Sequence, residues 1–310
     1  MAWVSWRPMI GMRLRTKYVR ERETFTRVFR KASSTLGEHR RSLSMATSVA
    51  GLVGLAWVMA QHGGWHAWQS VGLASPFALV LALALWPANM GLEVAKWNIL
   101  KAHHLPASGT EKASPWREVL MGQTAALLAP TRLADGAGRL VAWHTGHRQG
   151  AVAFAWGAAT QGWATWTMAV PALVMWGQPW PALALGAACA VASGFAFRTP
   201  THRTVAVLSL VRFAVFAVQC LACLVAFGAL MPGDALADGY PRIAAMWCAL
   251  TSIPWPVELG AREWIATLAF NEHLPSVVVG MLALWLINRA FSALAGWACF
   301  VQGSFNWRHG

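Results

Sequence analysis

Charged residues are scarce in this chain: they account for 12% of its 310 residues, whereas 56% are hydrophobic. No stretch is left over that could fold as a separate soluble domain. The alternation of apolar and polar residues that marks strands is also missing, and alanine and leucine dominate instead. These absences exclude a soluble globular protein and a membrane β-barrel, and they predict a helical integral membrane protein.

Motifs of familiar soluble chemistry are missing as well. No G-x-x-x-x-G-K-[ST] sequence is present to bind ATP, and no G-x-S-x-G sequence is present to form a hydrolase nucleophile elbow. Cys220 and Cys223 form a C-x-x-C, but they lie within an apolar run, where they are expected to pack rather than to react. A transporter-like protein is therefore favoured over an enzyme.

Potential metal ligands are few. His103 with His104, and His144 with His147, lie in segments predicted to be cytoplasmic and could gather a metal ion. Nearby carboxylates are rare, however, and nothing in the sequence brings the two pairs together. We therefore predict no metal site and no cofactor.

The apolar runs define the fold. Several reach the roughly 20 residues that a membrane-spanning helix needs. Spans are predicted at about 43–60, 76–100, 151–176, 182–197, 204–230 and 276–301. Two further runs are shorter and are interrupted by proline, glycine and charges. The predicted fold is an all-α polytopic membrane protein with about six transmembrane helices and two re-entrant, broken-helix hairpins in an inverted repeat.

The first 42 residues are strongly basic: 11 of the 25 Lys and Arg residues lie between Arg7 and Arg41. Such a concentration marks a cytoplasmic face, so the formal charge of +13 needs no nucleic-acid partner. Segment 1–42 either forms a basic helix on an anionic leaflet or is a solvated tail. The first apolar run lacks a cleavage pattern and is expected to remain as an anchor.

The distribution of charge along the chain predicts its topology. Outside the two hairpins, the segments predicted to be extracytoplasmic contain only Arg242 among Lys and Arg. Both termini are therefore predicted to be cytoplasmic in a multi-pass protein of the inner (cytoplasmic) membrane. The transmembrane domain is predicted at 43–302, followed by a tail at 303–310.

The second hairpin has the most unusual composition. Pro254 and Pro256 disfavour helix, Gly260 permits close approach, and Arg262 begins a new helix. Charge at membrane depth is rare and usually faces a protein interior or a cavity. We interpret the stretch as a broken membrane helix that forms half of a binding site. The alternative is a short extramembrane loop between two ordinary spans.

The two hairpins have similar centres, which predicts an internal repeat covering 43–176 and 182–301. The matching positions are Pro130, Asp135, Gly136 and Arg139 in the first and Pro254, Glu258, Gly260 and Arg262 in the second. Inverted repeats with broken helices at corresponding positions indicate a binding site near the membrane midplane. The amides at the new helix N-termini suit an anionic group.

Three short elements resemble a known family. They are Glu93-Val94-Ala95-Lys96-Trp97-Asn98-Ile99-Leu100-Lys101; Ala129-Pro130-Thr131-Arg132-Leu133-Ala134-Asp135-Gly136 with Arg139; and Gly260-Ala261-Arg262-Glu263 followed by Leu286-Ile287-Asn288-Arg289. They look like the lysylphosphatidylglycerol synthase transmembrane family, a flippase-like domain that is also found alone. The resemblance implies a polytopic helical protein, and in the synthases this domain is linked to moving an aminoacylated lipid between leaflets. The soluble aminoacyl-transfer domain of the synthases is not found, so lipid aminoacylation is not implied.

The leading hypothesis is a flippase-like protein that translocates or binds a phospholipid or a lipid-linked head group. Arg262 and Arg139 would hold a phosphate, and acidic residues would hold a cationic group or a coupling proton. The predicted substrate-binding residues are Arg262, Glu263, Glu258, Gly260, Arg139, Asp135, Arg132, Glu93, Lys96, Arg212 and Arg289.

Two other hypotheses remain open: a membrane-embedded lipid-modifying enzyme, and an accessory or structural subunit of an envelope-synthesis complex. The predicted partners are membrane lipids, with a homo-oligomer or an envelope-biosynthesis protein as further alternatives.

Overall fold

The computed structural model describes residues 69–104, 114–128, 132–141, 147–252 and 261–306, together with single positions between 49 and 66. These residues belong to one compact unit, Thr47–Gly310. The described residues form helices and turns and no strand, so the predicted all-helical class is confirmed. The basic segment 1–42 and most of the first predicted span lie outside the described residues.

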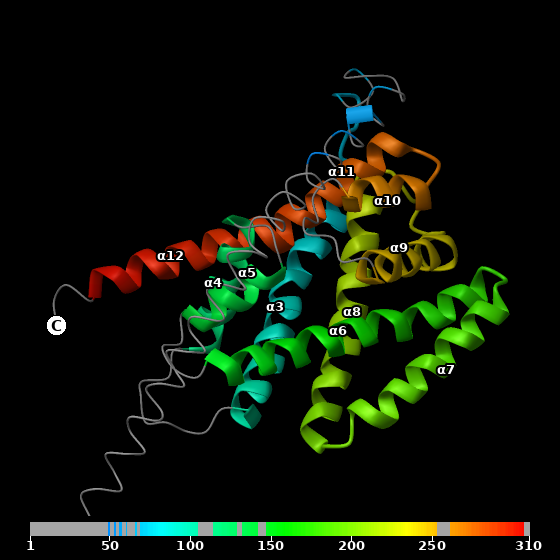
Figure 1. Cartoon of the computed structure of the whole chain (residues 1–310). Helices are drawn as coiled ribbons and strands as arrows, with labels where there is room; N and C mark the ends of the chain where they lie inside the picture. Colours follow the sequence, from blue (N-terminus) through cyan, green and yellow to red (C-terminus); the bar gives the residue numbers. More distant parts are fainter. Residues whose placement is uncertain are drawn as a thin grey trace, which may run out of the picture. The chain divides into compact units, whose positions relative to one another are not determined.

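Ten α-helices and two short π-helical segments make up the described chain (Figure 1). They are α3 (Pro76–His104), α4 (Pro115–Leu128), α5 (Arg132–Val141), α6 (His147–Met175), α7 (Pro179–Ala196), α8 (Pro200–Ala226), η1 (Ala235–Gly239), α9 (Tyr240–Ser252), α10 (Ala261–Ala269), α11 (Leu274–Trp285), η2 (Leu286–Ala290) and α12 (Phe291–Asn306).

The long helices α3 and α8 lie side by side in the centre and run antiparallel (Figure 1). Both begin with a proline, which has no N–H to leave unpaired at the start of a helix. Their opposite directions follow from two hydrogen bonds: Ala74 N–H donates to Ala226 O (2.8 Å), and Gln219 Nε2 donates to Ala82 O (2.8 Å). The start of α3 therefore lies beside the end of α8.

Three of the described helical segments are long and apolar enough to cross a membrane: Pro76–His104, Pro200–Ala226 and Leu274–Cys299. They correspond to the predicted spans at 76–100, 204–230 and 276–301. Helices α6 and α7 occupy the positions of the other two described spans, and α7 contains a shorter apolar stretch, Pro179–Gly194. The composition of these helices supports a membrane protein.

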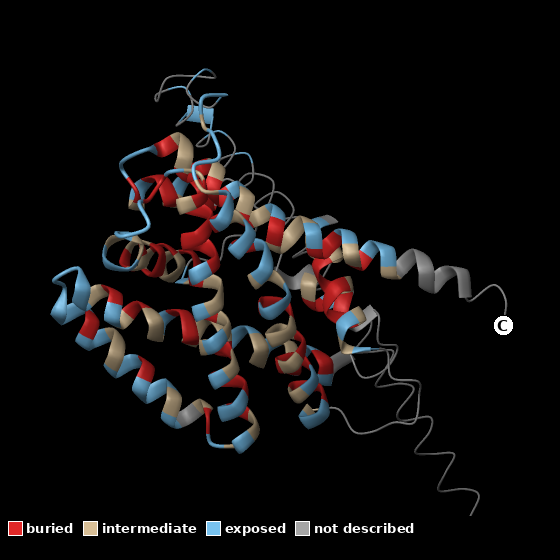
Figure 2. Cartoon of the chain, turned by 180° about the vertical axis from the view of Figure 1, so that it is seen from behind, coloured by how far each residue is buried: buried red, intermediate tan, exposed pale blue. Residues whose placement is uncertain are grey.

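Burial follows the pattern of a protein surrounded by lipid. Large apolar side chains are exposed on the outer faces of the candidate spans, including Phe77 (79% exposed), Val207 and Leu294. Exposed residues also dominate α7, whereas buried ones gather where the central helices meet (Figure 2). Polar and charged side chains, among them Lys96 and Arg139, are instead buried inside. An apolar exterior of this extent favours contact with lipid rather than with water.

Two pairs of short helices, α4–α5 and α9–α10, accompany the long ones. In each pair the two helices contact each other, and the connecting residues 129–131 and 253–260 lie outside the described residues. Helix α4 contacts α12, and α9 contacts α6. Each pair therefore packs against a long helix from the other half of the chain.

The apolar core has two parts. One surrounds α8, α9 and α11 and includes Cys220, Met246 and Met281, and the other surrounds α3 and α4 and includes Trp97 and Val119. Cys220 and Cys223 are free thiols that are fully buried in the first part. Their predicted packing role is therefore confirmed.

Candidate functional site

Arg139 on α5 forms the centre of a buried group of charges. Its Nε and Nη2 donate to the two carboxylate oxygens of Asp135, at 2.7 and 3.0 Å, and Nη2 also donates to Glu93 Oε1 at 2.9 Å. The Arg139 side chain is almost fully buried, with the residue 3% exposed. Its guanidinium also lies over the Trp97 ring, 5.4 Å from the ring centre, and over the Phe154 ring at 5.6 Å. Two carboxylates and two aromatic rings therefore fix this cation in place.

The other oxygen of Glu93 faces two more cations. Arg212 Nη1 on α8 lies 3.1 Å from Glu93 Oε2, and Lys96 Nζ lies 3.5 Å from the same oxygen. The amide oxygen of Gln161 on α6 accepts hydrogen bonds from both cations, at 3.0 Å from Arg212 Nη1 and 3.1 Å from Lys96 Nζ. Glu93 therefore joins side chains from three helices.

We call Glu93, Lys96, Asp135, Arg139 and Arg212 the central ion cluster. It holds three cationic and two anionic side chains, so it carries one positive charge in excess when all five are ionised. An uncompensated buried charge is costly, and an anion bound beside it would lower that cost. The Arg212 and Glu93 side chains retain 23% and 14% exposure, which leaves one side of the cluster accessible.

Helical spacing and small residues create this arrangement. Glu93 and Lys96 are three residues apart, and Asp135 and Arg139 are four apart, so each pair shares a helix face. Helix α4 approaches α5 closely at Gly122, where a Cβ atom would lie 2.2 Å from Asp135 Oδ1. Only a residue without a side chain can occupy that position while Asp135 keeps its bond to Arg139.

A chain of amide side chains extends from the cluster across the two halves. Arg212 Nε donates to Asn89 Oδ1 (3.1 Å), Asn89 Nδ2 donates to Asn288 Oδ1 (2.8 Å), and Asn288 Nδ2 donates to Gln219 Oε1 (2.9 Å). We call Asn89, Asn288 and Gln219 the amide chain. It joins α3, η2 and α8 by hydrogen bonds that are all made within the protein.

Arg262 and Glu263 form a separate buried pair at the start of α10. Arg262 Nη2 donates to Glu263 Oε1, and both residues are buried. Among the described residues the Arg262 guanidinium bonds only to Glu263, and its buried Nε has no hydrogen-bond partner.

The other predicted residues have different surroundings. Arg289 on η2 donates to Gln123 Oε1 on α4 at 2.7 Å. The side chain of Arg132 and the whole of Glu258 and Gly260 lie outside the described residues. The structure thus brings five of the predicted residues into one cluster and places Arg262 with Glu263 and Arg289 with Gln123.

Sequence reasoning overlooked several polar residues that the structure makes prominent. Glu118 on α4 is fully buried and accepts hydrogen bonds from Lys101 Nζ and Trp97 Nε1, both at 2.5 Å. The amide chain and Gln161 were overlooked too. A signal was available, because a polar side chain inside an apolar span usually faces the protein interior.

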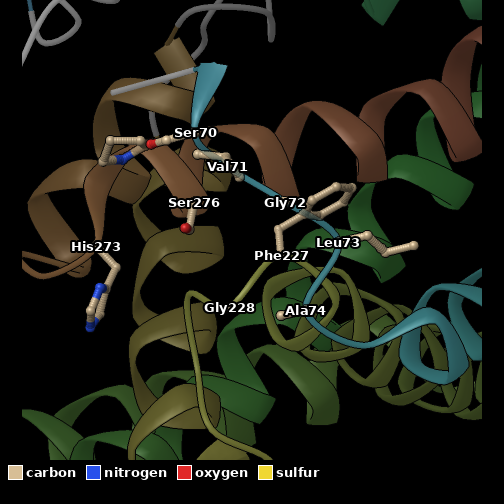
Figure 3. Close-up of a pocket in the computed structure, with 10 residues that line it drawn as sticks. Ser70, Val71, Gly72, Leu73, Ala74, Phe227, Gly228, His273 and Ser276 are labelled. Atoms are coloured by element: carbon tan, nitrogen blue, oxygen red, sulfur yellow. The ribbon is translucent and has the colours of Figure 1, made fainter. Parts of the chain in front are cut away.

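A pocket of about 470 Å³ lies away from these charges (Figure 3). The segment from Ser70 to Ala74 runs along one side, close to Phe227, and His273 and Ser276 lie on the other. None of the described lining residues is an aspartate, glutamate, lysine or arginine. The central ion cluster, which contains five such side chains, is therefore the stronger candidate site for a charged ligand.

The described residues form a helical protein with three candidate membrane-spanning helices and with an apolar exterior around a buried cluster of paired charges. No protein-family model, curated protein or solved structure matches this chain. Its function must therefore be inferred from its own residues.

Proposed function

We propose that this protein is a flippase-like, multi-pass protein of the cytoplasmic membrane that binds the anionic head group of a lipid at the central ion cluster and carries it between leaflets. One observation carries the proposal: three cationic and two acidic side chains meet inside a protein whose outer surface is apolar. A lipid phosphate would supply the missing negative charge, and its acyl chains would remain against the apolar exterior.

The geometry suits an oxyanion. Arg212 is the most accessible cation of the cluster, and its planar guanidinium can meet two phosphate oxygens at once. Lys96 shares the Gln161 oxygen with Arg212 and would contribute a second positive charge. Arg139 is held by Asp135 and Glu93, so it would fix the position of Glu93 rather than leave its own partners.

The proposal includes an inverted repeat in which α4–α5 and α9–α10 are re-entrant hairpins among six spans. Corresponding helices begin at nearly constant intervals: at residues 76 and 200, 115 and 240, 132 and 261, and 147 and 274. Their contacts correspond too. Helices α3, α4, α5 and α6 of the first half correspond to α8, α9, α10 and the segment α11–α12 of the second. In the first half α6 contacts α3 and α5, and in the second half α11 contacts α8 and α10 in the same way. Helix α4 contacts α12, and its counterpart α9 contacts α6.

The antiparallel packing of α3 against α8 is the arrangement that a two-fold axis in the membrane plane would produce. In transporters built this way the substrate site lies near the midplane at the repeat interface. The central ion cluster joins the two proposed repeats, because Glu93 belongs to α3 and Arg212 to α8.

A reconstitution experiment tests the proposal. The full chain is placed in vesicles that contain a fluorescent phosphatidylglycerol, and a membrane-impermeant quencher reports lipid that moves to the outer leaflet. We expect Arg212→Gln to abolish this movement. The variant leaves two cations and two carboxylates in the cluster, so the excess positive charge that would attract a phosphate is lost. Arg242→Gln is the matched control, since the Arg242 side chain is exposed to a similar extent as Arg212 but pairs with Asp238 outside the central ion cluster.

The same variants distinguish transport from a purely structural role. If the cluster only holds helices together, Arg212→Gln should lower the thermal unfolding temperature and reduce transport in proportion. If the cluster binds head groups, the Arg212→Gln protein should unfold near the wild-type temperature, because its remaining charges are balanced, but it should no longer transport lipid. A fully active Arg212→Gln protein would refute the proposal.

A further inference from the structure

Three histidines meet where the end of α3 approaches the start of α8. His103 and His104 are the last two residues of α3, and His202 lies in the first turn of α8. One ligand nitrogen from each lies within 4.8 Å of the others. The ring centres are 4.8 Å apart for His103 and His104, 5.3 Å for His103 and His202, and 5.8 Å for His104 and His202. We call these residues the histidine cluster.

Two of the three rings have a buried nitrogen without a partner. The Nε2 atoms of His104 and His202 are both buried and make no hydrogen bond, and His202 is only 7% exposed. A buried polar atom that loses its water and gains no protein partner destabilises the folded state. A ligand that accepts electron pairs from both nitrogens would remove this cost.

The position of His202 is well supported by its neighbours. Its ring stacks on Trp156 of α6, with centres 4.0 Å apart and planes 18° apart. Its backbone N–H donates to Thr199 Oγ1 at 3.2 Å, which caps the start of α8. A ligand at His202 would therefore meet a ring that is already oriented.

We infer that the histidine cluster is a binding site for a divalent transition-metal ion, with Zn²⁺ as the ion of best fit. Three imidazole nitrogens match the ligand preference of zinc, whereas Mg²⁺ and Ca²⁺ require oxygen ligands. Zinc–nitrogen bonds of about 2.0–2.1 Å require the three nitrogens to draw closer together. His103 is exposed and can make most of that movement by rotating its side chain.

The surrounding charges permit a cation at this place. Lys101, one turn away on α3, is paired with Glu118, and Arg203 Nε donates to the Phe197 carbonyl oxygen at 2.9 Å. The C-terminus of α3 contributes partial negative charge, which the opposite end of the α8 dipole partly offsets. A bound ion would join α3 and α8, the two central helices, at one end. The proposed metal site does not depend on lipid transport.

A cobalt titration tests the site directly. The full chain is purified in detergent with an affinity tag that contains no histidine, and it is then stripped with a chelator. We expect Co²⁺ to produce a visible ligand-field absorption that saturates near one ion per chain and that Zn²⁺ removes. Zn²⁺ should also raise the thermal unfolding temperature, whereas Mg²⁺ at the same concentration should not.

Three variants locate the binding. His202→Gln and His103→Gln should each weaken Co²⁺ binding at least tenfold, and His66→Gln, which changes an exposed histidine outside the cluster, should bind as the wild type does. Because His103 is exposed, its substitution should not disturb folding, which keeps the test valid if His202→Gln folds poorly. Equal Co²⁺ binding by the wild type and by His103→Gln, or no saturable binding by the wild type, would overturn the inference.

Discussion

Arg139 and Arg262 occupy comparable places in the two halves of the chain, on the short helices α5 and α10 that follow the proline-containing connections. Arg139 is held by both Asp135 and Glu93. Arg262, in contrast, pairs only with its neighbour Glu263 among the described residues and keeps a buried Nε without a partner. One half thus fixes its arginine through several bonds, whereas the other leaves bonding capacity unused.

This difference separates two roles that a buried arginine can have. A cation held by two carboxylates organises its neighbours, and removing it leaves those buried carboxylates without a partner. A cation with a free donor can accept an oxyanion without first breaking its existing bonds. We therefore expect Arg139 to contribute mainly to stability and Arg262 to provide a second contact for the head group, outside the central ion cluster. The following variants test this comparison.

The largest effect is expected from Arg139→Gln. It removes the cation that separates Glu93 from Asp135 and should lower the free energy of unfolding by about 3–5 kcal/mol, the usual effect of breaking a buried ion pair. Thermal unfolding in detergent would show this as a clear fall in the unfolding temperature. Arg262→Gln is the matched variant in the other half and should have a smaller effect; an equal or larger fall would contradict the comparison.

Gly122→Ala should have the next largest effect. The added methyl group would collide with Asp135 Oδ1 and Arg139 Cγ, so α4 and α5 must separate. Overpacking of this kind typically costs about 1–3 kcal/mol. Gly91→Ala is the control, because a Cβ at Gly91 meets no atom within 4 Å and alanine favours the helix. A similar unfolding temperature for both variants would argue against tight packing around Asp135.

Asn288→Leu tests the connection between the halves. It removes the middle of the amide chain and leaves polar groups of Asn89 and Gln219 without a partner. Each unsatisfied group costs about 1–3 kcal/mol, so the unfolding temperature should fall measurably. The exposed Asn271 provides the control, and Asn271→Leu should unfold at nearly the wild-type temperature. If the two variants behave alike, the amide chain does not stabilise the interface.

The smallest effect on stability, but a complete loss of function, is expected for Arg262→Lys. Lysine keeps the positive charge beside Glu263 but cannot hold an oxyanion with two parallel hydrogen bonds. The variant should accumulate in membranes at the wild-type level and fail to move the fluorescent lipid in vesicles, while Arg242→Lys remains active. A fully active, well-expressed Arg262→Lys protein would show that Arg262 does not bind the head group.

Several features of the fold were open to prediction from composition alone. Long apolar runs specify helices because every backbone N–H and C=O inside a membrane must be paired within its own segment. The predicted spans at 76–100, 204–230 and 276–301 accordingly match helices long enough to cross a bilayer. Glu93 and Lys96 were predictable as a pair for a similarly local reason, since a spacing of three residues places them on one helix face.

Long-range pairing was much harder to predict. Arg262 and Arg139 were both predicted to hold a phosphate, and nothing in the order of residues shows that Glu93 meets Arg139 and Arg212 from two other helices. The histidines illustrate the same limit. His103 with His104, and His144 with His147, were considered as two separate pairs and no metal site was predicted, but the structure brings His103 and His104 to His202.

Local composition and the energy of burying polar groups are enough to predict the helical class, the candidate spans and the presence of costly charges that require partners. The partners of those charges become clear only from the way the helices pack. The antiparallel contact of α3 with α8 brings Glu93 to Arg212 and His103 to His202, residues more than 90 positions apart. Such pairs form only when each helix has the right rotation about its axis and the right offset along its neighbour. Many side-chain contacts between the packed helices determine both quantities.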